Sequence, residues 1–414
     1  MKLKRKLTPW MQRLWFYLAI FGPGLITASA DNDAPGIATY SMAGSTYGYR
    51  FLWLLVVITV GEVVIQEMAA RMGAVTGKGT ADLIREQFGV KVTAFAMTCL
   101  FLANLGTTLA QFAGIAAGTE LLGISRYVTV PLAAVLVGFI VLRGSYKYVE
   151  KVLLVLCLSA LSYVVSGFII QPDWSEVARQ GLTPSFQGDS AYILAVLATI
   201  GTTITPWGIV YMQASVADKG VALKDYRYTR IDVMAGATWG NVVSAFIVIC
   251  TAATLFTHGI RVESAEQAAL ALEPLVGTSA RYLFSVGLLG ASLLAASVLP
   301  LSTTYAICEA FGWERGLDHR WHDAPVFYSL YLGMIGISVV IVLIPGIPLF
   351  SIMWLSQSLN AILLPVLLFL ILKLANNRRL MGEWVNTRLQ NVLAWCLTGI
   401  IGGITLVLLF SAVA

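Results

Sequence analysis

Two carboxylates and an amide stand together in an otherwise apolar stretch near the start of the chain: Asp31, Asn32 and Asp33. An ionised carboxylate within a bilayer costs about 2.5–3.5 kcal/mol on insertion scales, so such groups persist where a cation or a water-filled cavity compensates them. Carboxylate and amide oxygens are hard donors, which suit hard metal cations. The cluster therefore predicts an anionic cation site. A capping role at a helix start is a second interpretation for either aspartate.

The residues that follow this cluster predict that the helix around it is broken. Proline removes a backbone donor and glycine relaxes the helix, and both types recur in a second long apolar stretch, directly after Thr205. Freed carbonyls at such breaks add oxygen ligands and the negative end of a half-helix. The residues expected to line the site at the two breaks are Ala34, Pro35, Gly36, Pro206 and Gly208. Two ordinary proline kinks are the alternative.

The elements that must position these residues are membrane helices. The chain has 414 residues, of which 58% are hydrophobic and 12% charged, whereas soluble domains carry about a quarter charged residues. Apolar runs of about twenty residues match a hydrocarbon core of ~30 Å. Eleven spans are predicted at 14–47, 51–72, 93–122, 127–143, 148–170, 188–216, 231–257, 281–310, 326–344, 350–373 and 391–412.

The breaks fall in the first and sixth spans, five spans apart. Interruptions at corresponding positions of two halves indicate an inverted-repeat transporter with its site at the midplane. We therefore expect one all-α membrane transport domain over residues 1–414. It would contain two inverted five-helix repeats, about 14–170 and 188–373, and an extra helix at about 391–412.

Basic residues predict the orientation. With a cytoplasmic N-terminus, five of the 27 Lys and Arg residues face outward and the others face inward, as the positive-inside rule requires. The five are Arg50, Arg126, Arg179, Arg261 and Arg281. The net charge of +5 is explained by this bias, so no nucleic-acid partner is expected. The basic N-terminus lacks a cleavage site after a short apolar core, so we expect a retained first helix.

Other chemistry is not favoured. The five cysteines lie singly in apolar runs, and the three histidines fall in predicted loops. No nucleophile–base pair is evident, so the chain is predicted not to be an enzyme and to need no cofactor. Its expected partners are a transported metal ion and the lipid bilayer of the cytoplasmic membrane, with the oligomeric state left open.

Three segments carry a resemblance to a known family. The first contains Gly22-Pro23-Gly24, Asp33, Gly44, Gly48 and Leu52-Trp53. The second is QEMAARMGAVTGK at 66–78, and the third runs from Leu355-Ser356-Gln357 through Pro365 to RRLMG at 378–382. In this order they resemble the first, second and tenth helices of the Nramp (natural resistance-associated macrophage protein) divalent-metal transporters. The resemblance implies that family's amino-acid/sodium-symporter-like fold and alternating access.

The resemblance also implies a metal site. The family's D-P-G-N motif aligns with residues 33–36, so the aspartate ligand is Asp33, while Gly36 replaces the asparagine. On the sixth helix, Thr205 replaces the family's methionine ligand, and Thr202 stands where a backbone carbonyl helps to bind metal. Gln357 matches a tenth-helix glutamine that approaches the ion in some states.

These departures predict the cargo. A thioether favours transition metals, whereas oxygen donors suit Mg²⁺, Ca²⁺ and Mn²⁺. Gly36 and Thr205 are also smaller than the residues that they replace, and a roomier cavity suits a partly hydrated Mg²⁺. At these positions the chain looks like the Nramp-related magnesium transporters. Mg²⁺ is the first expected cargo, with Mn²⁺ as a co-substrate.

The proton route of the family is altered as well. Thr108 and Gln111 occupy the positions of a third-helix aspartate and glutamate, and Trp207 replaces a sixth-helix histidine. The resemblance therefore implies weak or absent proton coupling. A proton-coupled Mn²⁺/Fe²⁺ importer with a rebuilt relay and a sodium-coupled organic solute symporter of the same fold are the alternatives.

Two carboxylates of the second span carry separate expectations. Glu67 lies four residues before Arg71, a spacing that favours a helical ion pair. Glu62 lies near mid-span, where it could carry protons, belong to the cation path, or be a buried hydrogen-bonded carboxyl.

Overall fold

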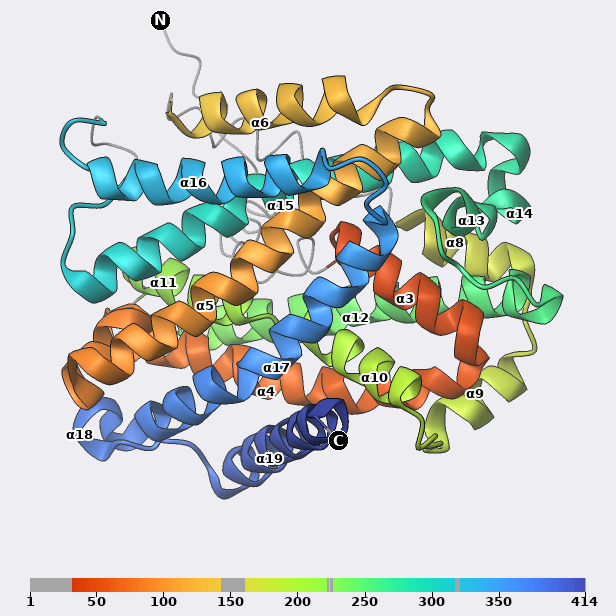
Figure 1. The fold of residues 1–414 in the computed structure, drawn as a ribbon. Helices are drawn as coiled ribbons and strands as arrows, with labels where there is room; N and C mark the ends of the chain where they lie inside the picture. Colours follow the sequence, from red (N-terminus) through yellow and green to blue (C-terminus); the bar gives the residue numbers. More distant parts are fainter. Residues whose placement is uncertain (1–31, 143–160, 222, 224–225, 317–320, 414) are drawn as a thin grey trace, which may run out of the picture.

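The computed structural model describes residues 32–142, 161–221, 223, 226–316 and 321–413, and these residues form helices joined by short turns, with no strand among them. Figure 1 shows their arrangement. The helices are α3 (Ala34–Tyr47), α4 (Leu52–Thr76), α5 (Thr80–Leu121), α6 (Arg126–Leu142), α8 (Leu161–Ile170), α9 (Trp174–Leu182), α10 (Ser190–Thr203), α11 (Pro206–Asp218), α12 (Tyr226–Thr254), α13 (Ala265–Leu270), α14 (Glu273–Val276), α15 (Ala280–Phe311), α16 (Pro325–Val342), α17 (Leu349–Ala375), α18 (Arg378–Met381) and α19 (Arg388–Val413).

Each of the eleven predicted spans contains a described helix. Among the described residues, eight stretches are long and apolar enough to cross a membrane, and the first of them contains both α3 and α4. The shorter apolar helices α6 and α8 fall in the fourth and fifth predicted spans. The beginnings of the first and fifth spans, and Asp31 with them, lie outside the described residues.

One helix is much longer than its predicted span. The third span is predicted to begin at residue 93, but α5 begins at Thr80 and has 42 residues. Its chain direction changes at Gly89, where φ is +79°, a conformation open to glycine because it has no Cβ. The residues before this kink are too polar for a hydropathy window to include them.

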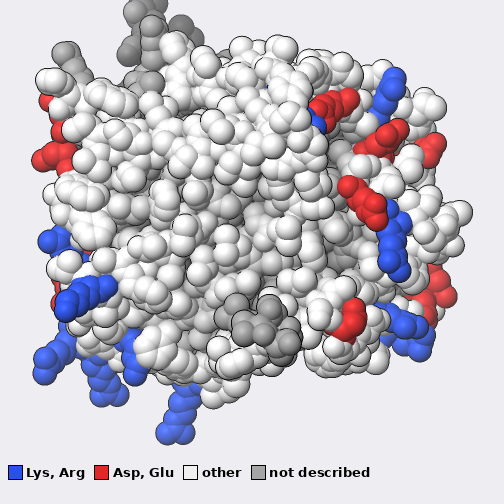
Figure 2. Space-filling model, in the orientation of Figure 1, with Lys and Arg blue, Asp and Glu red and all other residues white. Residues whose placement is uncertain are grey.

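α5 lies at the centre of the fold, where α15 and α17 pack against it (Figure 1). α3 packs against α10, α12 and α17, and α4 packs against α11 and α12. On the face drawn in Figure 2, charged side chains lie along the edges and an uncharged belt crosses the middle. A bilayer requires this distribution, because charge is costly in its hydrocarbon core.

At two contacts between helices, called glycine seams below, one of the two helices contributes a glycine and therefore no side chain. A Cβ on Gly44 of α3 would lie 2.6 Å from the carbonyl oxygen of Val248 on α12. A Cβ on Gly73 of α4 would lie 2.4 Å from the carbonyl oxygen of Gln213 on α11. Backbones approach this closely only where the residue is glycine, as is common between membrane helices.

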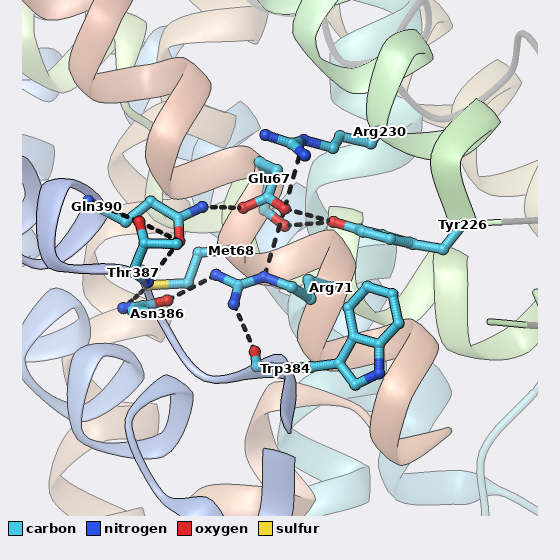
Figure 3. A network of polar contacts seen from close by, with 9 residues as sticks. All are labelled: Glu67, Met68, Arg71, Tyr226, Arg230, Trp384, Asn386, Thr387 and Gln390. Carbon is cyan, nitrogen blue, oxygen red and sulfur yellow. Dashed lines mark hydrogen bonds and ion pairs between the residues drawn. The ribbon is translucent and has the colours of Figure 1, made fainter. Parts of the chain in front are cut away.

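A polar network centred on buried Glu67 and Arg71 lies at the end of the bundle that is predicted to face the cytoplasm (Figure 3). The expected helical pair is present, with Arg71 Nε 3.3 Å from Glu67 Oε1. Tyr226 at the start of α12 donates to Glu67 Oε1 at 2.8 Å, and Gln390 of α19 donates to Glu67 Oε2 at 2.9 Å. Arg71 also donates to the side chain of Asn386 at 2.6 Å. The network thus joins α4, α12 and the segment leading into α19.

Candidate metal site

The start of α3, where the first break is predicted, is formed by Asp33, Pro35 and Gly36. The residues before Asn32 lie outside the described part of the chain, so a half-helix ahead of this break stays a prediction. Asp33 is the N-cap of α3, and its Oδ1 accepts a hydrogen bond from the backbone N–H of Gly36 at 2.9 Å. Pro35 lies in the first turn, where its missing N–H costs nothing. The capping interpretation therefore holds for Asp33, which is buried. The cap occupies one lone pair of Oδ1, so both carboxylate oxygens keep a lone pair that could bind a cation.

The second break separates α10 from α11. Ile204 and Thr205 leave the helical conformation, and Pro206 begins α11. Thr205 caps α11 by accepting from the N–H of Gly208 at 3.3 Å. The last carbonyls of a helix have no intrahelical partner, and those of α10 include Thr202. The interruption predicted for the sixth span is thus present, with buried Thr202 and Thr205 on either side of it.

Gln111 of α5 is bonded directly to Asp33. Its Nε2 donates to Asp33 Oδ2, and its Oε1 has no hydrogen-bond partner among the described residues. α5 also approaches the break closely, since a Cβ on Gly114 would lie 2.3 Å from the Cβ of Ala34. Sequence reasoning treated Gln111 only as a lost proton-path residue. In the fold it orients the carboxylate and brings a second oxygen to the break.

Thr108, the other altered position, contacts its own helix. Its hydroxyl donates to the carbonyl of Asn104 at 2.7 Å, and the side chain is fully buried. In an apolar environment, such a bond takes the place of the hydrogen bond that the hydroxyl would otherwise make to water. Thr108 therefore offers no titratable group at the break.

A hydrogen bond joins α3 to the end of α10, about two turns after Asp33 and two residues before Thr205. The hydroxyls of Tyr40 on α3 and Thr203 at the end of α10 are 2.9 Å apart. Both side chains are buried. Since α3 and α10 also pack together, Asp33 and the carbonyl end of α10 belong to one region of the interior.

Gln357 of α17 belongs to a polar cluster beside α10. Its Oε1 accepts from Asn360 Nδ2 at 2.9 Å, and Asn360 is also 2.9 Å from the hydroxyl of Thr107. α10 and α17 touch at Gly201, where a Cβ would lie 2.0 Å from the Gln357 carbonyl oxygen. Sequence reasoning missed Asn360 and Thr107. The available signal was an asparagine in an apolar run, which requires a buried partner.

Asn32, predicted to belong to the cation site, is hydrogen-bonded to α12. Its Nδ2 donates to the carbonyl of Gly240 at 3.1 Å, and its Oδ1 accepts from Ser244 at 3.1 Å. Both partners lie on α12. The side chain of Asn32 therefore fastens the first break to α12, and its role as a metal ligand stays a prediction.

The groups assigned to the site at the breaks offer oxygen atoms as ligands. The thioether of buried Met353 on α17 lies nearby, since its Sδ is 3.6 Å from where a Cβ on Gly114 would stand. No group of three or more His, Cys, Asp or Glu side chains suited to a metal occurs in the described part of the chain. Trp207 at the start of α11 is fully buried against Leu294 and Val298 of α15, so it fills space on that side with an apolar ring. A cation here would be held by one carboxylate, amide and hydroxyl oxygens and backbone carbonyls.

An acidic cavity opens at the end of the bundle that is predicted to face outward. It encloses about 870 Å³ and is lined by Glu120, Glu266 and Glu273, with Arg281 as a counter-charge. A neighbouring cavity of about 350 Å³ shares Glu120 and Glu266. Clefts lined by one sign of charge raise the local concentration of the opposite ion.

The chain was compared with known families and proteins. The family described as natural resistance-associated macrophage protein-like matches residues 24–411. The chain belongs to the Nramp family. Membership confirms the expected multi-pass membrane transporter and the expectation that the chain is not an enzyme.

Curated Nramp relatives match along nearly their whole length. A protein of Klebsiella pneumoniae named divalent metal cation transporter MntH is 29% identical over 392 residues, 93% of this chain and 92% of that protein. The protein of the same name from Yersinia pestis is 30% identical over 410 residues, 95% of each chain.

Solved structures confirm the fold. The manganese transporter of Eremococcus coleocola superposes with a TM-score of 0.79 at 21% identity, covering 98% of this chain and 90% of that one. MhsT in complex with L-phenylalanine gives a TM-score of 0.59 at 16% identity, covering 94% and 98%. The expected all-α membrane-transporter fold is therefore confirmed.

Proposed function

We propose that this Nramp chain carries hard divalent cations, Mg²⁺ and Mn²⁺, across the cell membrane by alternating access. The observation that carries the proposal is the set of oxygen donors at the two breaks: the Asp33 carboxylate is held by Gln111, and the Thr205 hydroxyl caps the opposite half-helix. Relatives named as divalent metal cation and manganese transporters support a divalent cargo.

The preference for Mg²⁺ rests on donor chemistry. Oxygen ligands do not discriminate against Mg²⁺ as a thioether does, and Mg²⁺ keeps part of its water when protein ligands are few. One carboxylate, the Thr202 carbonyl, the Thr205 hydroxyl and the oxygens of Gln111 and Gln357 form such a sparse set. We infer that the ion enters partly hydrated.

Weak proton coupling is the second part of the proposal. Thr108 and Gln111 cannot exchange protons near neutral pH, and both are buried beside Asp33 or one turn away. Uptake would then be driven by gradient and membrane potential, which supplies ~4.6 kcal/mol per 100 mV for a doubly charged ion. Proton-coupled Mn²⁺ import is the second candidate, and the manganese transporter among the structural relatives favours it.

Topology completes the proposal. The N-terminus would be cytoplasmic, so that the acidic cavity at Glu266 faces outward. The repeats would cover about residues 14–170 and 188–373, followed by an extra helix at about 391–412. A tag at the N-terminus that is accessible in intact cells would contradict this orientation.

The deciding experiment measures uptake of Mg²⁺, Mn²⁺ and Ca²⁺ into proteoliposomes that contain a pH dye. We expect Mg²⁺ and Mn²⁺ flux with little acidification, and acidification that keeps pace with Mn²⁺ would support the coupled alternative. Asp33→Ala should abolish uptake, and intact flux in that variant would remove the site assignment.

Thr205→Met tests the selectivity argument separately. The added sulfur should shift the flux ratio toward Mn²⁺, while Thr205→Val removes the cap without adding a thioether and serves as the control. An equal ratio in both variants would refute the ligand argument.

A further inference from the structure

A second polar cluster lies between α4 and α12, away from the residues assigned above. Glu62 is 1% exposed, and its Oε2 accepts a hydrogen bond from Asn241 Nδ2 of α12. Gln66 lies one helical turn further along the same face of α4 and is 2% exposed. The cluster thus holds a carboxylate and two carboxamides in the interior of the membrane domain.

Three polar atoms of this cluster have no hydrogen-bond partner among the described residues. They are Oε1 and Nε2 of Gln66 and Oδ1 of Asn241. A buried polar atom without a partner costs about 1–3 kcal/mol, so native proteins seldom leave several together. Their grouping beside a carboxylate indicates a ligand that needs oxygen donors.

The cluster lies at the depth of Asp33. Glu62 and Gln66 are ten and fourteen residues from the start of α4, which places them ~15 and ~21 Å from that end of the bundle. Asp33 caps a 14-residue helix that ends at the same end, and so lies ~21 Å from it.

α12 connects the cluster to the first break. Asn241 bonds to Glu62, and its neighbour Gly240 accepts from Asn32 at 3.1 Å. Asn32 directly precedes Asp33. Two hydrogen bonds and the single step from Gly240 to Asn241 therefore connect Glu62 to Asn32, the residue before Asp33.

We propose that Glu62, Gln66 and Asn241 form a second binding site for a hard divalent cation, beside the Asp33 site. One carboxylate and two amide oxygens are a donor set for Mg²⁺ or Mn²⁺ that retains water. Gln66 Nε2 would donate to one of those waters. The inference rests on the proposed function in that the ion is taken to be the transported one.

Counting bound Mn²⁺ tests the proposal on the purified full chain, because free Mn²⁺ gives a six-line paramagnetic resonance signal that is lost on binding. We expect two ions per chain, one in Glu62→Gln, one in Asp33→Ala, and none in the double variant. One ion in the wild type that Glu62→Gln leaves unchanged would overturn the second site. Binding unchanged by Asp33→Ala but reduced by Glu62→Gln would instead remove the proposed Asp33 site.

Matched variants separate binding from packing. Gln at position 62 can still accept from Asn241 but carries no charge, whereas Glu62→Asp keeps the charge and shortens the reach. Binding requires that Asp retain more of the second Mn²⁺ affinity than Gln, and that Gln66→Leu weaken it at least tenfold. If Gln retains full affinity and Asp loses it, Glu62 serves only as a hydrogen-bond acceptor and the proposal fails. Thermal melting of each variant identifies any that do not fold.

Discussion

The carboxylate of Asp33 is restrained on both oxygens, by the Gly36 N–H on one side and by Gln111 on the other. Restraint of this kind fixes the rotamer before an ion arrives, so that binding does not have to order the side chain. Gln111 belongs to α5, against which α15 and α17 pack, and so ties the first break to the centre of the fold.

We expect Gln111→Leu to raise the KM for Mn²⁺ by at least about tenfold. A hydrogen bond to a charged group is worth about 1.5–3 kcal/mol, and 1.4 kcal/mol corresponds to a factor of ten. The measurement is initial uptake into proteoliposomes over a range of Mn²⁺ concentrations.

Thr108→Val is the matched control. Thr108 is equally buried, but its hydroxyl bonds only to the backbone of its own helix. Its KM should stay within about twofold of the wild type, because no bond to Asp33 is lost. A larger effect of Thr108→Val than of Gln111→Leu would show that the region responds to any change in packing.

Local pattern predicted part of this site and could not predict the rest. Thr205 directly precedes a proline, and Asp33 lies two residues before one. Their capping roles could therefore be predicted from adjacent residues. The bonds of Gln111 to Asp33 and of Asn241 to Glu62 join residues 78 and 179 positions apart. Such partners depend on helix packing, which a single sequence does not reveal.

At the scale of the helices, we expect the contact of α10 with α17 to tolerate no added side-chain atom at Gly201. Gly201→Ala would place a Cβ 2.0 Å from the Gln357 carbonyl oxygen and 2.8 Å from the Ala361 nitrogen, and backbone cannot rotate away as a side chain can. Overpacking costs about 1–3 kcal/mol and occasionally more. We expect lower thermal stability in detergent and loss of uptake.

Gly333→Ala in α16 is the comparison, because a Cβ there meets nothing within 4 Å. It should melt at or slightly above the wild-type temperature, since alanine favours the helix. Equal losses in both variants would argue against the close α10–α17 contact.

The inner network gives a second test between elements. Arg71→Met leaves Glu67 buried, and among the described residues Arg230, whose Nε is 3.9 Å from Glu67 Oε1, is then its one cationic partner. Removing one member of a buried pair costs about 3–5 kcal/mol. The melting temperature should fall by several degrees, and the double variant Glu67→Gln/Arg71→Met should recover part of the loss. Additive losses would show that the two side chains do not act as a pair.

Helix positions followed from apolar runs, because a bilayer imposes both length and composition on each span. The first part of α5 was not predicted, because Asp82, Arg85 and Glu86 lower the mean hydropathy of that segment. The small helices α13 and α14 were also not predicted. They line the acidic cavity and fall below the length that periodicity can identify.

At the scale of the whole molecule, we expect the charge of the acidic cavity to affect the rate of cation uptake. We expect Glu266→Gln/Glu273→Gln to lower Mn²⁺ uptake severalfold at low ionic strength and to have little effect near 1 M salt, where the Debye length is ~3 Å. Both residues are exposed in the cavity. Uptake is measured at two salt concentrations.

Glu383→Gln is the control at the opposite end of the molecule, since Glu383 is also exposed. It should not change uptake from the outer side. If all variants respond alike, or if the effect persists at high salt, the cavity does not concentrate cations.

The glycine seams limit how the molecule can change shape. At Gly73 the backbone of α4 lies directly against the Gln213 carbonyl, and at Gly44 the backbone of α3 lies against the Val248 carbonyl and the short side chain of Thr251. These contacts therefore hold little side-chain volume that could re-pack. A sliding motion would drive the next, larger residue into a carbonyl. We therefore expect α3 to travel with α12 and α4 with α11, as two stiff pairs. Distances between spin labels placed within a pair should stay constant when metal is added, while distances from either pair to α5 change.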